Sequence, residues 1–363
     1  MESSTSTKPR SRTIRRVFTW LAVPLLGFAA FAFVTAKGST PSLAQSDTHS
    51  IAEERMIELG GVEQYVLLRG KDRTAPLLVY VHGGPGASAT PFLRTHNAEL
   101  ENEFIAVYWD QRGAAKSFNS NLDPAYMTID KMTADLGELI DLLLAEFNQE
   151  QVILVGHSWG TVLALEHVAN RPETVAAYIA VSQTTNQSES NTLGVEWALA
   201  QAQAAGDENA IAKLEAIGLP PYTIEEFYTQ RRYLNQFGGT LVEPQTDLDL
   251  LRLSLATSEF AWPDAISFVR STSFSGRALW AEQQQYDAQT RHSSIEVPMY
   301  LMLGQHDKVI SPELGIEYFD SLEAPEKELI WFEESAHAPL FEEPEKFNRS
   351  VKEIAEDVGI FNQ

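Results

Sequence analysis

VILVGHSWGT, residues 152–161, carries the strongest indication of the fold of this chain. Its first four residues are apolar and mostly β-branched, which predicts a buried strand, and the apolar run 162–169 predicts a helix. A serine at a sharp turn between a strand and a helix is typical of a nucleophile elbow, where backbone strain exposes the hydroxyl. We therefore expect Ser158 to be a nucleophile rather than part of a plain glycine-rich turn. Gly156 and Gly160 are expected where a Cβ would collide with the neighbouring strand or helix.

The same alternation of strand and helix continues on both sides of this stretch. Apolar residues at helical spacing predict a helix over 128–147, with Thr128 as its N-cap, and a closing helix over 344–358. Short apolar segments predict further strands at 63–68, 77–82, 104–109, 175–181, 297–303 and 327–332. Strands alternating with helices favour an α/β fold class with a mostly parallel central sheet flanked by helices.

The alternation is interrupted between residues 183 and 292. This segment is rich in Gln, Ala, Glu and aromatic residues and predicts several helices, with breaks at 219–222 and 238–239. We interpret it as a helical cap that is inserted into the sheet domain. The core would then consist of two parts, residues 51–182 and residues 293–363.

The N-terminal segment has the pattern of a membrane-targeting sequence. Residues 1–16 are polar and basic, residues 17–36 carry no charge and are long enough to cross a bilayer as a helix, and residues 37–50 predict a polar linker. The basic flank predicts a cytoplasmic N-terminus and a periplasmic or extracellular body. Two interpretations remain: an uncleaved signal anchor, or a signal peptide cleaved after Ala36 or Ala44 that leaves a secreted protein.

Charge and cysteine content exclude several classes of function. The chain has a formal net charge of −23, yet residues 1–45 carry six basic residues and one acidic residue, a charge of +5, which leaves −28 on the remainder. Such an acidic body excludes nucleic acid as an expected partner. The absence of cysteine excludes disulfides, thiol catalysis and cysteine-ligated metals. The oligomeric state stays open at this point.

Two further residues complete the chemistry that a serine nucleophile needs. A serine hydroxyl is a weak nucleophile until a base accepts its proton and a carboxylate orients that base. Parallel strands bring such groups together at their carboxyl ends. Asp307 follows the strand 297–303 and His337 follows the strand 327–332. The chain order Ser158, Asp307, His337 therefore predicts a nucleophile, its orienting carboxylate and its general base.

Neighbouring histidines and carboxylates compete for these roles. His306 is another candidate base, but it directly precedes Asp307, which makes orientation by that carboxylate difficult. His157 flanks the nucleophile, and we expect it to be structural and to point away beside the strand end. The remaining acidic residues near these segments are expected to be solvated surface charges: Asp320, Glu333 and Glu334.

HGGPG, residues 82–86, follows a strand that is predicted to be buried. Glycines allow backbone N–H groups to approach a substrate closely. We expect the backbone N–H groups of Gly84 and Trp159 to form an oxyanion hole. A plain Gly/Pro turn is the alternative.

Together these motifs resemble the α/β-hydrolase superfamily and, more narrowly, the proline iminopeptidase (prolyl aminopeptidase) family of serine peptidases. The resemblance covers about residues 60–182 and 295–355. It implies a sheet with a helical cap, with no metal and no organic cofactor. The residues that carry it are His82, Gly83, Gly84, Pro85 and Gly86, then Asp110, Gln111, Arg112 and Gly113 with Lys116 and Ser117, then Gly156, His157, Ser158, Trp159 and Gly160, and finally Gly304 to Asp307 and Ser335 to His337.

The chain departs from the family pattern at two places. Ala115 stands where the family usually has a glycine, and the cap lacks the family's run of tryptophan and glutamate. In the family, cap carboxylates pair with the free α-amino group of the substrate. The candidates for that role here are also typical solvated helix charges: Glu196, Glu225, Glu226, Glu259 and Glu282.

Three functions are compatible with the sequence. The motif set favours a serine aminopeptidase that releases an N-terminal residue, in the family proline, from short peptides. A carboxylesterase or amidase of small molecules with the same triad is the alternative, and a non-catalytic binding protein on the same fold is the third. Haloalkane and epoxide chemistry is disfavoured because those relatives attack with an aspartate where this chain has Ser158.

Overall fold

The computed structural model describes residues 38–43 and 49–362. Within these residues, eight strands form one sheet in the order β1-β2-β4-β3-β5-β6-β7-β8. β1 is antiparallel to β2 and β2 to β4, whereas every other neighbouring pair is parallel. The prediction of a mostly parallel α/β sheet is therefore confirmed. The strands are β1 (Ile51–Leu59), β2 (Val62–Gly70), β3 (Leu77–Val81), β4 (Ile105–Trp109), β5 (Val152–His157), β6 (Val175–Val181), β7 (Met299–Gly304) and β8 (Lys327–Phe332).

The central strands are apolar because both of their faces are covered. In β3, Leu77, Val79 and Val81 pack into one hydrophobic cluster, and Leu78 and Tyr80 pack into the cluster on the opposite face. The sequence does not predict β1, which is mostly half-exposed and polar and pairs only with β2 at the edge of the sheet. An edge strand of this kind lacks the apolar run that marks a buried strand.

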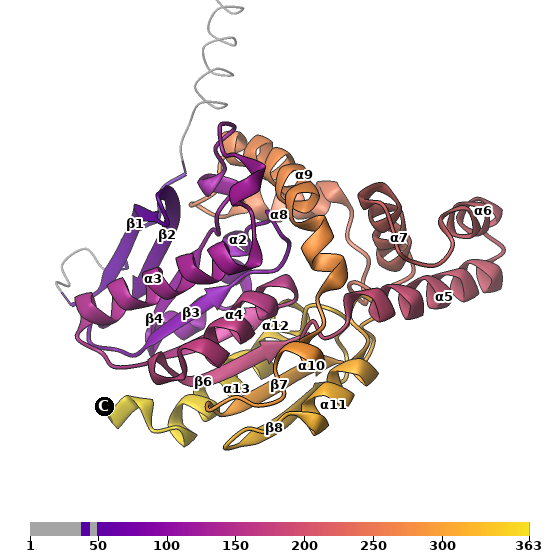
Figure 1. Cartoon of the computed structure of the whole chain (residues 1–363). Coiled ribbons are helices and arrows are strands. Elements are labelled where there is room, and N and C mark those ends of the chain that lie inside the picture. Colours follow the sequence, from indigo (N-terminus) through magenta and orange to yellow (C-terminus); the bar gives the residue numbers. More distant parts are fainter. Residues whose placement is uncertain (1–37, 44–48, 363) are drawn as a thin grey trace, which may run out of the picture.

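Helices cover the two faces of the sheet (Figure 1). Helices α3 (Ile129–Phe147), α4 (Trp159–Asn170) and α11 (Pro312–Ser321) pack on one face. The other face is covered by α2 (Thr90–His96), α12 (Pro339–Glu342) and α13 (Pro344–Asp357). Thr128 is confirmed as the N-cap of α3, since its side chain accepts a hydrogen bond from the Lys131 N–H. The short 3₁₀ turns are η1 (Ala98–Asn102), η2 (Ala115–Ser117), η3 (Pro124–Tyr126), η4 (Pro172–Thr174) and η5 (Ile360–Asn362).

A helical insert lies between β6 and β7, as the sequence predicts. It contains α5 (Gln187–Ala205), α6 (Glu208–Ile217), α7 (Ile224–Gln236), α8 (Asp247–Ala256), α9 (Trp262–Gln285) and α10 (Ala288–Arg291). Helices α5, α6 and α7 have their own apolar cluster and project from the sheet domain in Figure 1. The C-terminal part of α9 returns to the main core, where Leu279 is fully buried.

Part of the expected N-terminal linker is packed on the body. In residues 38–43, Ser39 N–H donates to Ser258 O at 2.8 Å, and Thr40 contacts the core and the insert. The expected membrane segment, residues 17–36, lies outside the described residues. Among residues 38–43 and 49–362, no helix has both the length and the apolarity needed to cross a bilayer.

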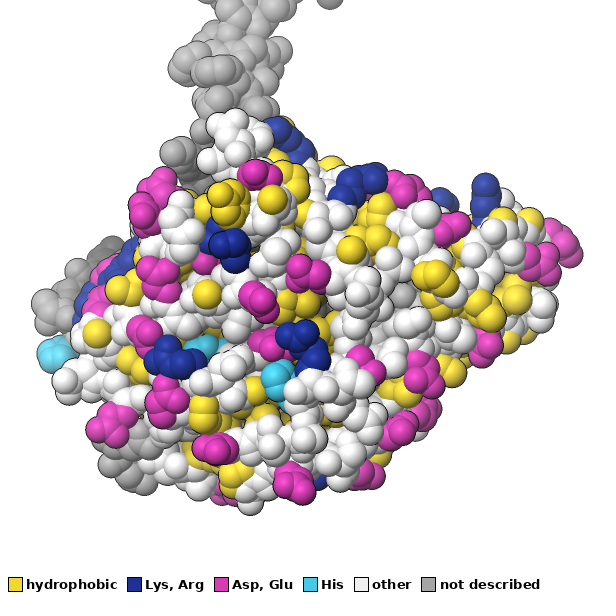
Figure 2. All heavy atoms as spheres, in the orientation of Figure 1, with side chains coloured by type: hydrophobic (Ala, Val, Ile, Leu, Met, Phe, Trp, Pro, Cys, Tyr) yellow, Lys and Arg dark blue, Asp and Glu magenta, His cyan; other side chains and the backbone are white. Residues whose placement is uncertain are grey.

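The visible face of the molecule carries charges of both signs without a continuous basic patch (Figure 2). Carboxylates are scattered over the sheet domain and over the projecting helices. This distribution agrees with the acidic composition of the body.

Candidate active site

The serine turn has the geometry that its sequence predicts. Ser158 has φ 52° and ψ −123°, a strained conformation for a residue with a side chain, and the next residue begins α4. A Cβ on Gly160 would lie 1.9 Å from Val81 O of the adjacent strand, and a Cβ on Gly156 would lie 3.0 Å from Thr161 Cα. Gly160 is therefore required for the close approach of α4 to β3, and a side chain at Gly156 would be in tight contact with the start of α4.

The structure brings Ser158, Asp307 and His337 together. His337 Nε2 lies 2.8 Å from Ser158 Oγ, and His337 Nδ1 lies 2.8 Å from Asp307 Oδ2. An ionised carboxylate only accepts hydrogen bonds, so Nδ1 carries the ring proton. The lone pair on Nε2 is then free to accept the serine proton.

Backbone N–H groups hold the two partners of the serine. Asp307 is fully buried, and its Oδ1 accepts hydrogen bonds from Val309 N–H at 2.8 Å and Ile310 N–H at 3.0 Å. The loop of His337 is held by Glu342, which accepts from the N–H groups on both sides of the histidine and from Val242 of the insert. Sequence reasoning did not find Glu342, because its partners are backbone groups that leave no residue pattern.

The competing histidines take other positions. His306 is exposed and does not contact Ser158. His157 lines the same cavity as Ser158 and donates from Nε2 to the backbone O of His337 at 2.9 Å. The expectation that it points away is therefore wrong, although a supporting role remains. Burial lowers the pKa of His157 to about 3, so it is neutral. Asp320, Glu333 and Glu334 are exposed, as expected.

One buried network connects the two predicted oxyanion elements. His82 donates from Nδ1 to Gly83 O at 2.7 Å and accepts from Gln111 N–H at 3.1 Å, and burial lowers its pKa to about 4. The Gln111 side chain donates to His82 O at 2.7 Å and accepts from Trp159 Nε1–H at 3.1 Å. His82 and Gln111 therefore position the backbone that would contact an oxyanion.

Gly84 and Trp159 line the cavity next to the serine. Trp159 is the first residue of α4, so its N–H has no acceptor within the helix. Gly83 packs against the serine, since a Cβ there would lie 3.3 Å from Ser158 Cβ. The Gly84–Pro85 peptide bond is cis. Both expected donors are thus near Ser158.

The DQRG motif supports the site without lining the cavity. Asp110 is buried and accepts from Ser88 Oγ and Lys116 N–H, while burial raises its pKa to about 6. Arg112 forms a buried two-pronged ion pair with Asp135, with both N–O distances 2.7 Å. At the family's glycine position, Ala115 has φ 32°, a conformation that glycine adopts with less strain.

Helix α9 of the insert forms hydrogen bonds with the loops that follow β3 and β4. Ser271 Oγ lies 2.8 Å from Gly86 O and accepts from Ala115 N–H at 3.1 Å. Ser275 Oγ donates to Gly113 O at 2.9 Å. Both serines are fully buried. The insert therefore closes over the serine and leaves a cavity of about 400 Å³ that Phe227, Phe268 and other apolar side chains line.

None of the five cap glutamates lines this cavity. Glu196 is exposed, and Glu225 pairs with Arg277 at the surface. The others have structural partners: Glu226 closes the capping box of α7, Glu282 accepts from Ile129 N–H, and Glu259 is buried.

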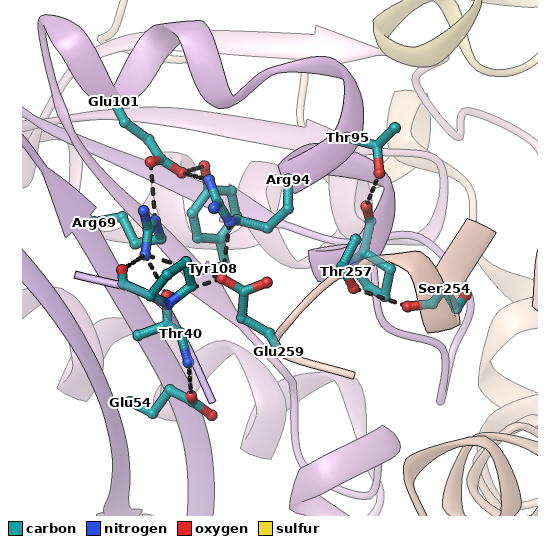
Figure 3. Close-up of polar contacts among 12 residues, drawn as sticks. Thr40, Glu54, Arg69, Arg94, Thr95, Glu101, Tyr108, Ser254, Thr257 and Glu259 are labelled. Atoms are coloured by element: carbon teal, nitrogen blue, oxygen red, sulfur yellow. Dashed lines mark hydrogen bonds and ion pairs between the residues drawn. The ribbon is translucent and has the colours of Figure 1, made fainter. Parts of the chain in front are cut away.

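Glu259 belongs to a buried ionic cluster rather than to helix surface charge (Figure 3). It pairs with Arg94 at 3.1 Å and accepts from Thr40 Oγ1 at 2.8 Å. Arg94 also pairs with Glu101, which in turn pairs with Arg69 at 2.9 Å. The cluster joins the insert, the sheet domain and residues 38–43, and it does not face the serine.

Comparison with known proteins places this geometry among hydrolases. Residues 76–344 match the family model described as alpha/beta hydrolase fold. The chain is 31% identical over 310 residues to a Bacillus subtilis (strain 168) protein named "Probable aminopeptidase YbaC", covering 84% of this chain and 97% of that one. It is 25% identical to a proline iminopeptidase of Heyndrickxia coagulans, covering 74% and 87%. A proline iminopeptidase structure from Mycobacterium smegmatis superimposes with a TM-score of 0.62 at 15% identity, covering 84% and 98%.

Proposed function

Because this chain belongs to the α/β-hydrolase fold family, in its proline iminopeptidase-like branch, we propose that it is a serine hydrolase that forms an acyl-enzyme on Ser158. One observation carries the proposal. A continuous hydrogen-bond chain runs from Asp307 through His337 to Ser158 Oγ, and the serine lies in a cavity under the insert.

The reaction follows from these positions. Ser158 Oγ attacks the substrate carbonyl carbon while His337 Nε2 accepts its proton, and Asp307 stabilises the resulting imidazolium. The carbonyl oxygen, now negative, accepts from the N–H groups of Gly84 and Trp159. The carbon–nitrogen or carbon–oxygen bond then breaks as His337 protonates the leaving group. Water repeats the sequence on the acyl-enzyme and regenerates Ser158.

For the substrate, we propose short peptides from which one N-terminal residue is released. The support is the similarity to curated relatives that are named as aminopeptidases or proline iminopeptidases. The cavity of about 400 Å³ lies at the low end of the range of about 300–1,000 Å³ for small-molecule sites, so folded chains are excluded. Proline as the preferred residue is part of the proposal.

A carboxylesterase or amidase of small molecules is the second candidate. The observation in its favour is that no Asp or Glu is among the described residues that line the cavity. An α-amino group would therefore need neutral acceptors, such as the side chains of Gln187 and Gln283, which line the cavity.

A comparison of three substrates separates the two candidates. With the full chain in detergent, we would measure kcat/KM for proline p-nitroanilide, its N-acetyl form and p-nitrophenyl butyrate. Turnover of the free-amine anilide alone supports the aminopeptidase, whereas a fast ester and no effect of acetylation favour the esterase. Fluorophosphonate labelling that disappears in Ser158→Ala supports either enzyme, and a folded protein that is never labelled would refute the catalytic function.

We also propose that the body acts outside the cytoplasm. The support is the basic tail at residues 1–16 followed by the uncharged segment 17–36. The intact mass of protein recovered from membranes tests the anchor. A mass that lacks 36 or 44 residues would establish cleavage instead.

A further inference from the structure

The cavity around Ser158 contains one charged side chain that the proposed mechanism does not use. Among the described residues that line it, the ionisable side chains are His157, Tyr228, Arg231 and His337. Arg231 is the only arginine or lysine among them. Arg231 lies on α7 of the insert and is half-buried. Its place in the sequence does not mark it as a site residue, because an arginine within a helix is usually a solvated charge.

No described carboxylate lies within ion-pair distance of Arg231. Its hydrogen bonds go to Val309 O at 3.3 Å and Asn191 Oδ1 at 3.4 Å, and both are long for charged donors. Its guanidinium also lies over the Phe227 ring, 4.5 Å from the centroid. A guanidinium has five N–H donors, so these two weak bonds leave donors for a ligand.

Arg231 is also close to the catalytic residues. Its acceptor, Val309, donates its own N–H to Asp307 Oδ1, so a single loop connects the arginine to the proposed orienting carboxylate. Val309, Arg231 and Ser158 all line the same cavity. A small molecule that fills this cavity is therefore in reach of both Arg231 and Ser158.

Burial of this cation is costly unless an anion accompanies it. Desolvation lowers the pKa of Arg231 to about 10, and the nearby Asp307 charge only partly opposes this effect. The guanidinium stays charged at neutral pH. A methionine or leucine at position 231 would pack against the same apolar side chains without the desolvation cost of a charge. An anionic ligand would pair with the Arg231 guanidinium and offset the desolvation cost of its charge.

We propose that Arg231 is the anion-binding residue of this site and that the preferred substrates carry a carboxylate. The planar guanidinium fork matches a carboxylate in two-pronged geometry. For a short peptide the anion is the C-terminal carboxylate, and this part rests on the proposed peptidase function. In a cavity of this size, that carboxylate belongs to a di- or tripeptide.

The acidic surface does not prevent such a substrate from binding. The charge of −28 on the body is scattered over its surface, and at 0.15 M ionic strength exposed charges are screened beyond about 8 Å. Inside the cavity water screens less, so the nearby cation dominates. High salt should therefore change the preference for a carboxylate only weakly.

Two matched substrate pairs test the proposal. The first is prolyl-alanine and prolyl-alaninamide, with release of proline as the readout. The second is p-nitrophenyl hydrogen glutarate and p-nitrophenyl methyl glutarate, with release of p-nitrophenol. We would compare the wild-type chain with Arg231→Met, Arg231→Lys and, as a control with the same change in charge, Arg232→Met, since Arg232 is its exposed neighbour.

The expected result is a preference of the wild-type chain for the charged member of at least one pair. Arg231→Met should lower kcat/KM for that member by about 10- to 100-fold, mainly through KM, and should spare the uncharged member. Arg231→Lys should retain part of the preference, and Arg232→Met should retain all of it. If Arg231→Met does not fold, the wild-type preference and its partial loss in Arg231→Lys decide the question.

The outcomes separate this inference from the proposed function. Equal loss on both members of a pair would mean that Arg231 only supports the Asp307 loop, and no preference in either pair would overturn the inference. Peptide cleavage without a preference would leave the aminopeptidase in place. A glutarate preference without peptide cleavage would remove the aminopeptidase and keep the anion site.

Discussion

At the scale of single residues, burial keeps the supporting histidines neutral. His82, His157 and His167 all have a lowered pKa, and burial is the largest cause in each case. Neutral rings donate from one nitrogen and accept at the other, which is how His82 connects Gly83 to Gln111. The neutral ring of His157, 5.2 Å from that of His337 between centroids, also keeps positive charge away from His337, which must gain a proton during the reaction.

Asp307→Asn should abolish most of the activity without unfolding the protein. The amide oxygen can still accept from Val309 and Ile310, but an amide NH₂ facing Nδ1 forces His337 into the wrong tautomer. We expect kcat for p-nitrophenyl butyrate to fall about 10⁴-fold, as this substitution does in a Ser-His-Asp triad. The exposed Asp320→Asn is the control, and an Asp307→Asn variant with wild-type kcat would refute the assigned role.

His167→Gln should make the protein less sensitive to acid. The folded-state pKa of His167 is about 4 against an ordinary value of 6.5, so between these values the unfolded chain binds more protons. The free energy of unfolding therefore falls as pH falls through this window. Between pH 7.5 and pH 5, the decrease should be smaller in the variant by about 2 kcal/mol. Glutamine can still donate to Thr174, and urea unfolding at the two pH values measures the difference.

At the scale of elements, helix α9 connects the insert to the loops next to the serine. Its two buried serines bond the backbone of the HGGPG and DQRG loops. The insert is thus not only a cover, since it contributes to the position of the oxyanion elements. Glu342 has a comparable role at the other end, where it joins the His337 loop to Val242 of the insert.

Gly86→Ala should therefore lower kcat/KM by more than its loss of stability accounts for. Gly86 has φ +81°, and a Cβ there would lie 2.5 Å from Ser271 O, so α9 must move. Gly206→Ala is the matched control, because Gly206 has φ +66° and open space around the new Cβ. Both variants should lose about 1–2 kcal/mol in free energy of unfolding, because alanine is strained in the left-handed backbone conformation. We expect only Gly86→Ala to lose at least about tenfold in kcat/KM, and equal activity of the two variants would contradict this role of α9.

At the scale of the whole molecule, residues 38–43 connect the N-terminal segment to the body. Arg69 donates to Thr40 Oγ1 and to Pro41 O, and a Cβ on Gly38 would lie 2.5 Å from the Glu259 backbone. The point of attachment lies between the sheet domain and the insert (Figure 3). Residues 38–43 therefore stabilise the packing of the insert on the sheet domain. They also link the body to the N-terminal segment.

Removal of these six residues should lower the melting temperature. A chain of residues 44–363 loses the partners of Arg69 and Glu259 that a chain of residues 38–363 retains. Hydrogen bonds to charged groups contribute about 1.5–3 kcal/mol each, and each kcal/mol corresponds to about 2–4 °C in a large domain. We expect a loss of at least about 3 °C by calorimetry. Identical melting temperatures would show that the segment contributes nothing to stability.

Much of the fold could be read from the chain because the relevant signals are local. The apolar runs of β3 to β8, the N-cap Thr128 and the glycines of the serine turn each reflect constraints within a few residues. The alternation of strand and helix predicts the parallel sheet, and the position of Asp307 and His337 after their strands predicts where they meet. β1 escaped prediction because an exposed edge strand has no apolar run.

The hydrolase fold and the residues Ser158, Asp307 and His337 could be identified from the sequence alone. Each of the three residues follows a recognisable strand, and β5, β7 and β8 bring them together at the carboxyl edge of the sheet. Which charged side chains line the cavity depends instead on how the insert packs on the sheet domain. This packing buries Glu259 in an ionic cluster, pairs or exposes the other cap glutamates, and leaves Arg231 in the cavity. The physical reason is that the partner of a charge on a cap helix depends on how separate helices pack, and helical spacing alone carries no record of that packing.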